Sequence, residues 1–273
     1  MLQEMRVRVW WPEGTPAAPA LPLEQPAGQV AAHPLPPGAD PAPRRALPVA
    51  AAQPPIRAVP GAPAHEASAL DAMDMPALAQ TVAACAACRL CEGRKTAVFA
   101  SPEPARQTDW LVVGDPPTDD DERAGTPFAA AQGELLDNML RAVQCSRSGS
   151  GAAGAWLTHV VKCRPAMVRN PEPDELTRCA MYLRQEVALV RPRVILAMGR
   201  YAALSLLAAS DPDIAKVPAG KLRGRLHTFE GVPVVVTYSP ARLLRAPLEK
   251  AGAWADLCLA RTAALRDPDP AEA

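Results

Sequence analysis

The stretch RVILAMGRYAALSLL, residues 193–207, joins two structural patterns through one glycine. Its first part, 193–199, is an almost continuous apolar run, which is typical of a parallel strand that is buried on both faces. The part after Gly199 has the apolar spacing of a helix. The stretch therefore predicts a strand that leads directly into a helix, the repeating unit of an α/β fold.

The same alternation continues on both sides of this stretch. Three more apolar runs are expected to form strands, at 110–114, 156–162 and 232–238. Helical patterns follow at 130–143, 173–190 and 248–265. This order predicts helices layered on a parallel sheet. Because ligands of such sheets bind beyond the carboxyl ends of the strands, we expect functional residues at these ends.

The residues before this pattern have a different composition. About half of the 32 prolines of the 273-residue chain lie before residue 77. Residues 12–75 contain too few large apolar residues to form a core, so we expect a disordered linker there. The chain then divides into a head peptide (1–11), this linker (12–75) and one domain (76–268). The head could be a frayed end, or a docking peptide in which Trp10 and Trp11 bind a protein partner.

The charge and the cysteine count limit the class of protein. The formal net charge is zero, and we find neither a secretory signal nor a run of about 18 apolar residues that would span a membrane. The seven cysteines are an odd number, which favours metal binding or reactive thiols over a disulfide framework. We therefore expect a monomeric cytoplasmic protein.

The segment CAACRLC, residues 85–91, contains a CxxC pair, Cys85 and Cys88. Three kinds of site are compatible with it. A zinc ribbon needs a second CxxC, whereas the chain offers the single residues Cys163 and Cys179. A thioredoxin-type motif should follow a strand, but this one precedes the first strand. A cubane iron–sulfur cluster needs four thiolates without fixed pairing, so spacing alone favours a cluster over zinc only modestly.

Five blocks of the domain resemble the type-4 uracil-DNA glycosylases, the iron–sulfur branch of that superfamily. They are CAACRLCEGRK, GTPFAAAQGELLDNML, VVKCRPAMVRNPEPDE, GRYAALSLL and TYSPARLLR. The resemblance implies a three-layer αβα sandwich on a four-stranded parallel sheet. It also implies a [4Fe–4S] cluster held by Cys85, Cys88, Cys163 and Cys179, with Cys91 as a bystander.

The resemblance implies base excision from DNA, but the catalytic motifs depart from the family pattern. Phe128 matches the aromatic residue on which the extruded base stacks. Asp115 stands where the family has Glu, and could orient a water or oppose the positive charge on the sugar. His159 replaces the Asn that reads the uracil edge, and Ser239 replaces a His that donates to the uracil oxygen. In the same loop as Asp115, Pro116 and Thr118 replace small residues.

Losing one such donor typically lowers the rate about 100- to 1000-fold, so we expect weakened or retuned activity. His159 could supply the imidazole that Ser239 lacks.

The DNA-contacting loop is better preserved. By resemblance, Leu243 would wedge into the gap left by the flipped base, with Leu244 as the alternative, and Arg242 and Arg245 flank it. Two hypotheses follow. The chain is a uracil-DNA glycosylase with altered activity on single-stranded or duplex DNA, or it is a catalytically silent relative that binds DNA or a protein.

Overall fold

The computed structural model describes residues 70, 72–100, 107–166, 169–208 and 210–266. All of them belong to the unit Arg57–Ala273, the second of the two units into which the chain divides. The head (1–11) and nearly all of the linker (12–75) lie outside the described residues, so these two boundaries stay predictions.

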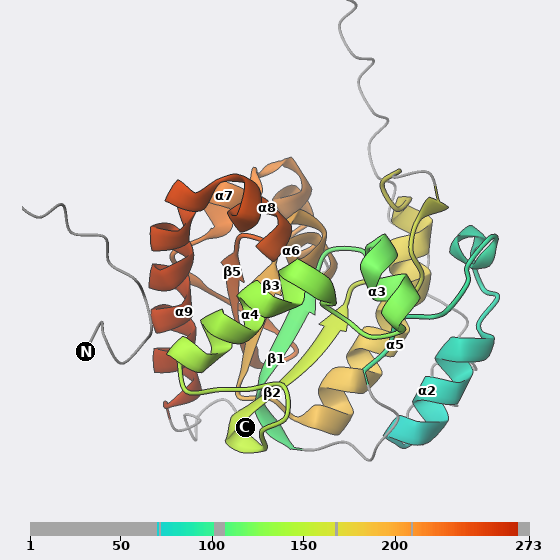
Figure 1. Ribbon diagram of the computed structural model, residues 1–273, viewed down its shortest axis with the longest axis horizontal. Coiled ribbons are helices and arrows are strands. Elements are labelled where there is room, and N and C mark those ends of the chain that lie inside the picture. Colours follow the sequence, from blue (N-terminus) through green and yellow to red (C-terminus); the bar gives the residue numbers. More distant parts are fainter. Residues whose placement is uncertain (1–69, 71, 101–106, 167–168, 209, 267–273) are drawn as a thin grey trace, which may run out of the picture. The chain divides into compact units, whose positions relative to one another are not determined.

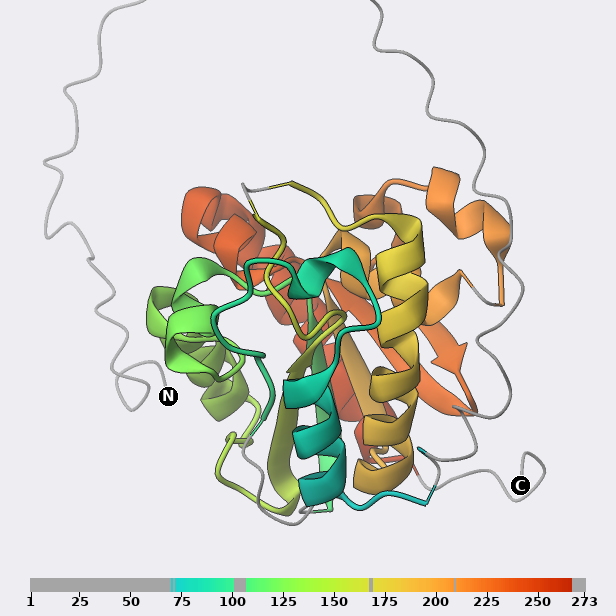
Figure 2. The same cartoon turned by 90° about the vertical axis from the view of Figure 1, so that its right-hand side faces the viewer.

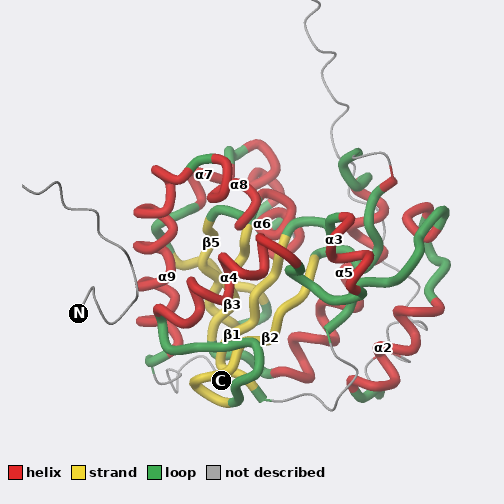
Figure 3. The backbone as a smooth tube through the Cα atoms, in the orientation of Figure 1, coloured by secondary structure: helices red, strands yellow, loops and turns green. Residues whose placement is uncertain are grey.

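A mostly parallel sheet forms the centre of this unit (Figure 3). Its strands are β1 (Thr108–Gly114), β2 (Gly151–His159), β3 (Val194–Met198), β4 (Leu226–Phe229) and β5 (Val232–Thr237). Their order in the sheet is β2-β1-β3-β5-β4, and the first four of these pair in parallel. The predicted parallel four-stranded sheet is therefore confirmed. It is extended by β4, which pairs antiparallel with β5.

Two strands differ from the prediction: β4 was not predicted, and β2 begins and ends earlier than the predicted run 156–162. Residues 226–229 form one arm of a tight hairpin around Glu230 and Gly231, too short and too polar to give a strand pattern. The predicted run 156–162 extends three residues beyond the real end of β2 at His159. Val160 and Val161 are apolar because the turn after the strand is buried, not because the strand continues.

Helices cover both faces of the sheet, as the sandwich prediction requires. On one face lie α4 (Ala130–Ala142) and α9 (Lys250–Ala264), and on the other α2 (Met75–Ala84), α5 (Pro173–Val190) and α6 (Arg200–Leu207) (Figure 1). The strand β1 separates the two cores. Trp110 and Val112 pack in the core with α4 and α9, and Leu111 and Val113 pack in the opposite core. Alternate side chains of a strand point to opposite faces, so the four residues 110–113 are all apolar.

Shorter elements connect these layers. They are α3 (Asp119–Ala124), α7 (Ala219–Leu222), α8 (Pro240–Arg245) and the 3₁₀ turns Arg89–Cys91, Pro212–Lys216 and Pro247–Glu249. Figure 2 shows α2 beside α5, with the segment after α2 crossing above them toward the turn that follows β2. Within the described residues, no helix is both long and apolar enough to cross a membrane.

The sequence around residue 173 places the start of α5 correctly. Pro173 occupies the first turn, where its missing N–H is not needed, and Asp174 and Glu175 follow it at the positive end of the helix. The Glu175 carboxylate accepts a hydrogen bond from the backbone N–H of Glu172 at 2.7 Å. These interactions fix the helix that carries Cys179.

Candidate active site

The carboxyl ends of the four parallel strands lie in register at one edge of the sheet. His159 pairs with Gly114, Gly114 with Met198, and Met198 with Thr237. The residues that follow these ends are therefore neighbours, although they are far apart in sequence. We call this edge, with the loops that follow it, the functional edge.

Asp115 is the first residue after β1, and it is bound to the start of α6. Its Oδ1 accepts hydrogen bonds from the backbone N–H groups of Tyr201 at 2.7 Å and Ala202 at 3.3 Å. Burial raises the pKa of Asp115, although the N–H groups of the helix act in the opposite direction. A Cβ atom on Gly199 would lie 2.0 Å from Asp115 Oδ2, so this turn requires a glycine, which also has φ +111°.

His159, the last residue of β2, is buried, and one of its ring nitrogens is hydrogen-bonded. Nδ1 lies 2.6 Å from the carbonyl oxygen of Asp115, which can only accept, so Nδ1 carries a hydrogen. The ring centroid lies 4.7 Å from that of Phe128, at an interplanar angle of 31°. A Cβ atom on Gly114 would lie 2.5 Å from Phe128 and 2.7 Å from His159. We call Gly114, Phe128 and His159 the base site.

Asp121 completes the surroundings of His159, and sequence analysis did not single it out. Its Oδ2 lies 3.5 Å from His159 Nε2, and both side chains are buried. The carboxylate accepts hydrogen bonds from Thr118 N–H, Thr118 Oγ1–H and Ala129 N–H, each at 2.7 Å. Burial alone would raise the pKa of Asp121, but the neighbouring imidazole and these donors lower it to about 2. Asp121 is therefore ionised at neutral pH.

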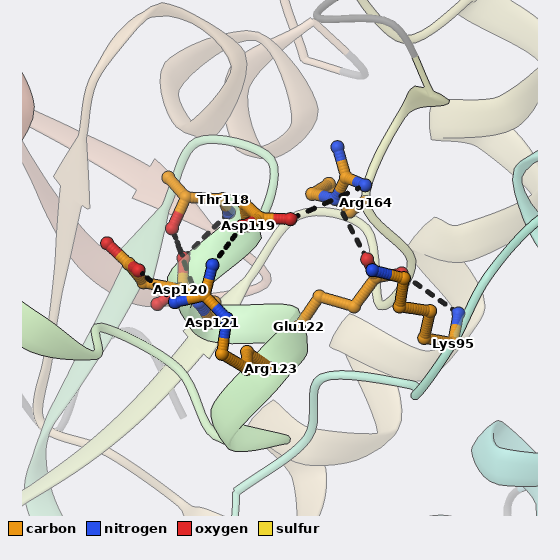
Figure 4. Close-up of polar contacts among 8 residues, drawn as sticks. All are labelled: Lys95, Thr118, Asp119, Asp120, Asp121, Glu122, Arg123 and Arg164. Atoms are coloured by element: carbon orange, nitrogen blue, oxygen red, sulfur yellow. Dashed lines mark hydrogen bonds and ion pairs between the residues drawn. The ribbon is translucent and has the colours of Figure 1, made fainter.

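The role of Thr118 differs from the one expected. Sequence analysis treated it as added bulk, whereas it is the N-cap of α3 and forms a capping box with Asp121 (Figure 4). The spacing T-x-x-D at 118–121 is the signal that could have identified Asp121.

The next residue, Glu122, is also buried and accepts from Arg164 Nε at 2.9 Å and Lys95 N–H at 3.1 Å (Figure 4). Arg164 thus joins α3 to the turn after β2.

Ser239 lies on the functional edge, at the other end of the four parallel strands from His159. It follows β5, while His159 ends β2, and β1 and β3 lie between these strands. At a strand spacing of about 4.8 Å the two positions are roughly 14 Å apart along the edge. Beside Ser239, two guanidinium groups lie over the Tyr238 ring. The Cζ atom of Arg223 is 3.9 Å from the ring centroid, and that of Arg242 is 4.7 Å from it.

The loop that was predicted to contact DNA forms the helix α8. The preference for Leu243 over Leu244 as the wedge is wrong. Leu243 is 1% exposed and belongs to the core, so it is not available to enter a duplex, whereas Leu244 is 43% exposed. Neighbouring residues of a helix point in different directions, and the helical conformation was not predicted. Arg242 forms two hydrogen bonds with Glu249, at 2.5 and 2.6 Å, and Arg245 is exposed.

The four predicted cluster ligands line a single cavity. Cys85 and Cys88 follow α2, Cys163 lies in the turn after β2, and Cys179 lies in α5. Burial raises the pKa of Cys88 and of Cys163, and it raises the pKa of Cys179 to about 12. The neighbouring cysteines act in the same direction on each of these thiols. The guanidinium of Arg94 acts against this trend, because Nη1 donates to Cys163 Sγ at 3.2 Å.

The remaining cysteines lie at other places. Cys91 is half-buried, Cys145 is buried with a pKa raised by burial to about 11, and Cys258 is exposed. In the part of the chain that the structure describes, no three His, Cys, Asp or Glu side chains are grouped closely enough to hold a metal ion.

Comparison with known proteins agrees with this geometry. The family model of the uracil DNA glycosylase superfamily matches residues 101–260. A type-4 uracil-DNA glycosylase of Pyrobaculum aerophilum is 32% identical over 191 residues, which cover 68% of this chain and 93% of that protein. That of Thermotoga maritima is 33% identical over 63% of this chain and 83% of its own length. The type-4 uracil-DNA glycosylase of Archaeoglobus fulgidus is 32% identical over 59% of this chain and 79% of its own length.

Proposed function

Because this chain belongs to the uracil DNA glycosylase superfamily, in which it is similar to type-4 enzymes, we propose that it flips a damaged base out of DNA and hydrolyses its N-glycosidic bond. We further propose that the exchanges at residues 159 and 239 alter this activity. The observation that supports this best is the base site itself. It holds an aromatic ring and an imidazole in contact at the functional edge.

In the proposed mechanism, Phe128 stacks the flipped base and His159 faces its polar edge. The hydrogen bond of Nδ1 to Asp115 fixes the imidazole ring. Nε2 is the remaining nitrogen, and the ionised Asp121 carboxylate lies 3.5 Å from it. With a hydrogen on Nε2, the imidazole can donate to a base oxygen as negative charge develops there, and such a hydrogen bond stabilises the transition state.

The other predicted site residues take smaller parts in this proposal. Asp115 opposes the positive charge that develops on the sugar, while its hydrogen bonds to α6 hold it in place. The hydroxyl of Ser239 can donate one neutral hydrogen bond in place of an imidazole. The exposed Leu244 wedges into the gap left by the flipped base, and the exposed Arg245 contacts a phosphate. Arg242 must first leave Glu249 before it can bind a phosphate.

We also propose a [4Fe–4S] cluster on Cys85, Cys88, Cys163 and Cys179. The spacing of the four thiols favours it modestly over zinc, because the chain has one CxxC pair followed by the single residues Cys163 and Cys179. All four residues line one cavity. When bound, the cluster supplies structural cross-links and not an electron, because hydrolysis of the bond transfers none.

A second candidate function is that of a catalytically silent relative that binds DNA or a protein. It is favoured by the contact between His159 and Phe128, because the imidazole occupies one face of the ring on which a base would stack. Ser239 also lacks the imidazole that the family uses. In this candidate, the exposed Leu244 would serve binding alone.

Release of uracil from single-stranded and U·G duplex oligonucleotides separates the two candidates. The double variant Ser239→His with His159→Asn restores the family pattern and is measured beside the parent. We expect measurable release by the parent, and a drop of about 10-fold or more in the single variant His159→Asn, which lacks the imidazole donor. An inert parent that gains activity in the double variant would instead support the silent relative. If both are inert, Pro116→Ala tests whether the missing N–H is responsible.

A further inference from the structure

The Lys162 ammonium is buried beside both the base site and the proposed cluster ligands. Lys162 is 1% exposed, and its Nζ donates to the carbonyl oxygen of His159 at 3.0 Å, to Thr158 Oγ1 and to Glu186 Oε2. Its acceptors therefore include the last two residues of β2, one of which is His159. The ammonium is fully enclosed by polar partners, as burial of a charge requires.

The backbone of the same residue is bonded to the cysteine side. Lys162 N–H donates to Cys179 Sγ at 3.4 Å, and its carbonyl oxygen accepts from Val98 N–H at 2.7 Å. The following residue is Cys163, whose Sγ accepts from Arg94. One residue thus contacts the end of the base-reading strand with its side chain and the cysteine cavity with its backbone.

Glu186 holds this lysine from α5. It is 0% exposed, and its carboxylate also accepts from Trp156 Nε1 at 3.3 Å and Thr158 Oγ1 at 3.0 Å. Both partners of this ion pair are therefore bonded to β2. A pair of apolar side chains at such a position is often as stable as a buried ion pair, so stability alone does not explain the pair. The ion pair instead fixes the direction of each hydrogen bond that Lys162 and Glu186 make.

We propose that Lys162 is a positioning residue that couples the cluster site to His159, with Glu186 as its counterion. Cluster ligation fixes Cys163 and Cys179, these fix the Lys162 backbone, and the Lys162 side chain then fixes the carbonyl group of His159. The inference rests on the proposed roles of the cysteines and of His159. It assigns to the cluster an influence on the geometry of base recognition, in addition to its cross-linking.

The test uses the full chain with Lys162→Met and Glu186→Gln combined. The glutamine oxygen can still accept from Trp156 Nε1, and its NH2 group can donate to Thr158 Oγ1, so the change removes the lysine contacts without leaving a lone buried charge. The control combines Lys216→Met with Asp213→Asn, an exposed ion pair whose removal leaves the same net charge. The readouts are the visible absorbance of the cluster, the ring NMR signal of His159, and uracil release. With four histidines in the chain, the His159→Asn variant identifies the signal.

We expect the double variant to keep the cluster absorbance, to shift the His159 signal, and to lower kcat about 10- to 100-fold with a smaller change in KM. The control should change none of the three. An unshifted His159 signal with normal uracil release would overturn the proposal. If the double variant fails to fold, Lys162→Arg replaces it, since it keeps the charge but moves the donors. It should then shift the signal in the same way.

Removal of the cluster completes the test. Cys85→Ala removes a ligand that Lys162 does not contact, and it should shift the His159 signal in the parent more than in the double variant. Equal shifts in both backgrounds would contradict the coupling. A parent without visible absorbance would refute the cluster assignment instead, and one that releases no uracil would refute the catalytic proposal. The shift caused by the double variant tests the lysine contact in either case.

Discussion

Asp121 shows how one buried carboxylate organises several parts of the functional edge. It binds the N-cap of α3, the backbone next to Phe128 and the imidazole of His159. Its pKa of about 2 lies below the value of about 3.9 of an unfolded aspartate. The folded state is thus stabilised above the unfolded pKa, and this stabilisation is lost as the pH falls toward 2.

We predict that Asp121→Asn removes this pH dependence. Wild-type protein should lose about 2 kcal/mol of unfolding free energy between pH 5 and pH 2 through this group, and the variant should not. Denaturant unfolding across this range measures the difference. Asp120→Asn, at an exposed neighbouring carboxylate, is the control and should behave as the wild type does. Parallel acid curves for Asp121→Asn and wild type would show that the pKa of Asp121 is not lowered in the folded protein.

Gly114 provides a second prediction at this scale. Because a Cβ atom there would meet both rings of the base site, Gly114→Ala should push Phe128 and His159 apart. We expect destabilisation of about 1–3 kcal/mol from overpacking, together with a strong loss of uracil release. Gly220→Ala, where a Cβ atom meets nothing within 4 Å, is the control. Thermal unfolding and uracil release check both variants, and full activity in Gly114→Ala would contradict the described packing.

At the scale of elements, the two adjacent leucines of α8 have different environments. Leu243 packs in the core and Leu244 faces outward. We predict that Leu243→Ala lowers the unfolding free energy by about 2–5 kcal/mol. Leu244→Ala should leave stability unchanged and weaken release of uracil from duplex DNA, with less effect on single strands. Unfolding curves and both substrates measure this split. If Leu244→Ala acts equally on both substrates, it is not a wedge.

The segment from α2 to β1 depends on contacts made by single side chains. The Arg94 guanidinium donates to Cys163 Sγ and to the carbonyl oxygen of Ala83, and the Glu122 carboxylate accepts from the backbone N–H of Lys95. A positive charge next to a cluster thiolate stabilises it. We therefore predict that Arg94→Gln loses its visible absorbance faster than wild type in the presence of an iron chelator. Arg89→Gln, an exposed arginine of the same segment, should not. Equal rates of loss would show that Arg94 does not protect the cluster.

At the scale of the whole molecule, the proposed cluster joins three segments that are distant in sequence. Its ligands come from the segment after α2, from the turn after β2 and from α5. We predict that Cys85→Ala, which removes one ligand, first releases residues 76–100. Amide hydrogen exchange should accelerate there while β1 and β3 stay protected, because both strands lie inside the sheet. Uniform acceleration across the unit would mean that the cluster stabilises the entire fold.

The sequence alone determined the alternation of strands and helices, because apolar periodicity reports burial directly. It placed α5, β1, β3 and β5 to within one or two residues, whereas the run predicted at 156–162 was shifted relative to β2, and the family motifs pointed to four cysteines that line one cavity and to His159. These features depend on local composition and spacing. The edge hairpin with β4 gave no such signal, since its burial is partial and its pairing involves only four residues.

Only the tertiary structure decided which groups meet. The hydrogen bond from His159 to the Asp115 carbonyl, the approach of Asp121 to His159 and the enclosure of Lys162 by Glu186 join residues that lie 24 to 44 positions apart. No pattern within one segment encodes such contacts, because they arise when parallel strands align their ends. In the same way, only the conformation of α8 decided between Leu243 and Leu244. Burial is a property of the folded molecule, whereas two adjacent leucines are equivalent in the sequence.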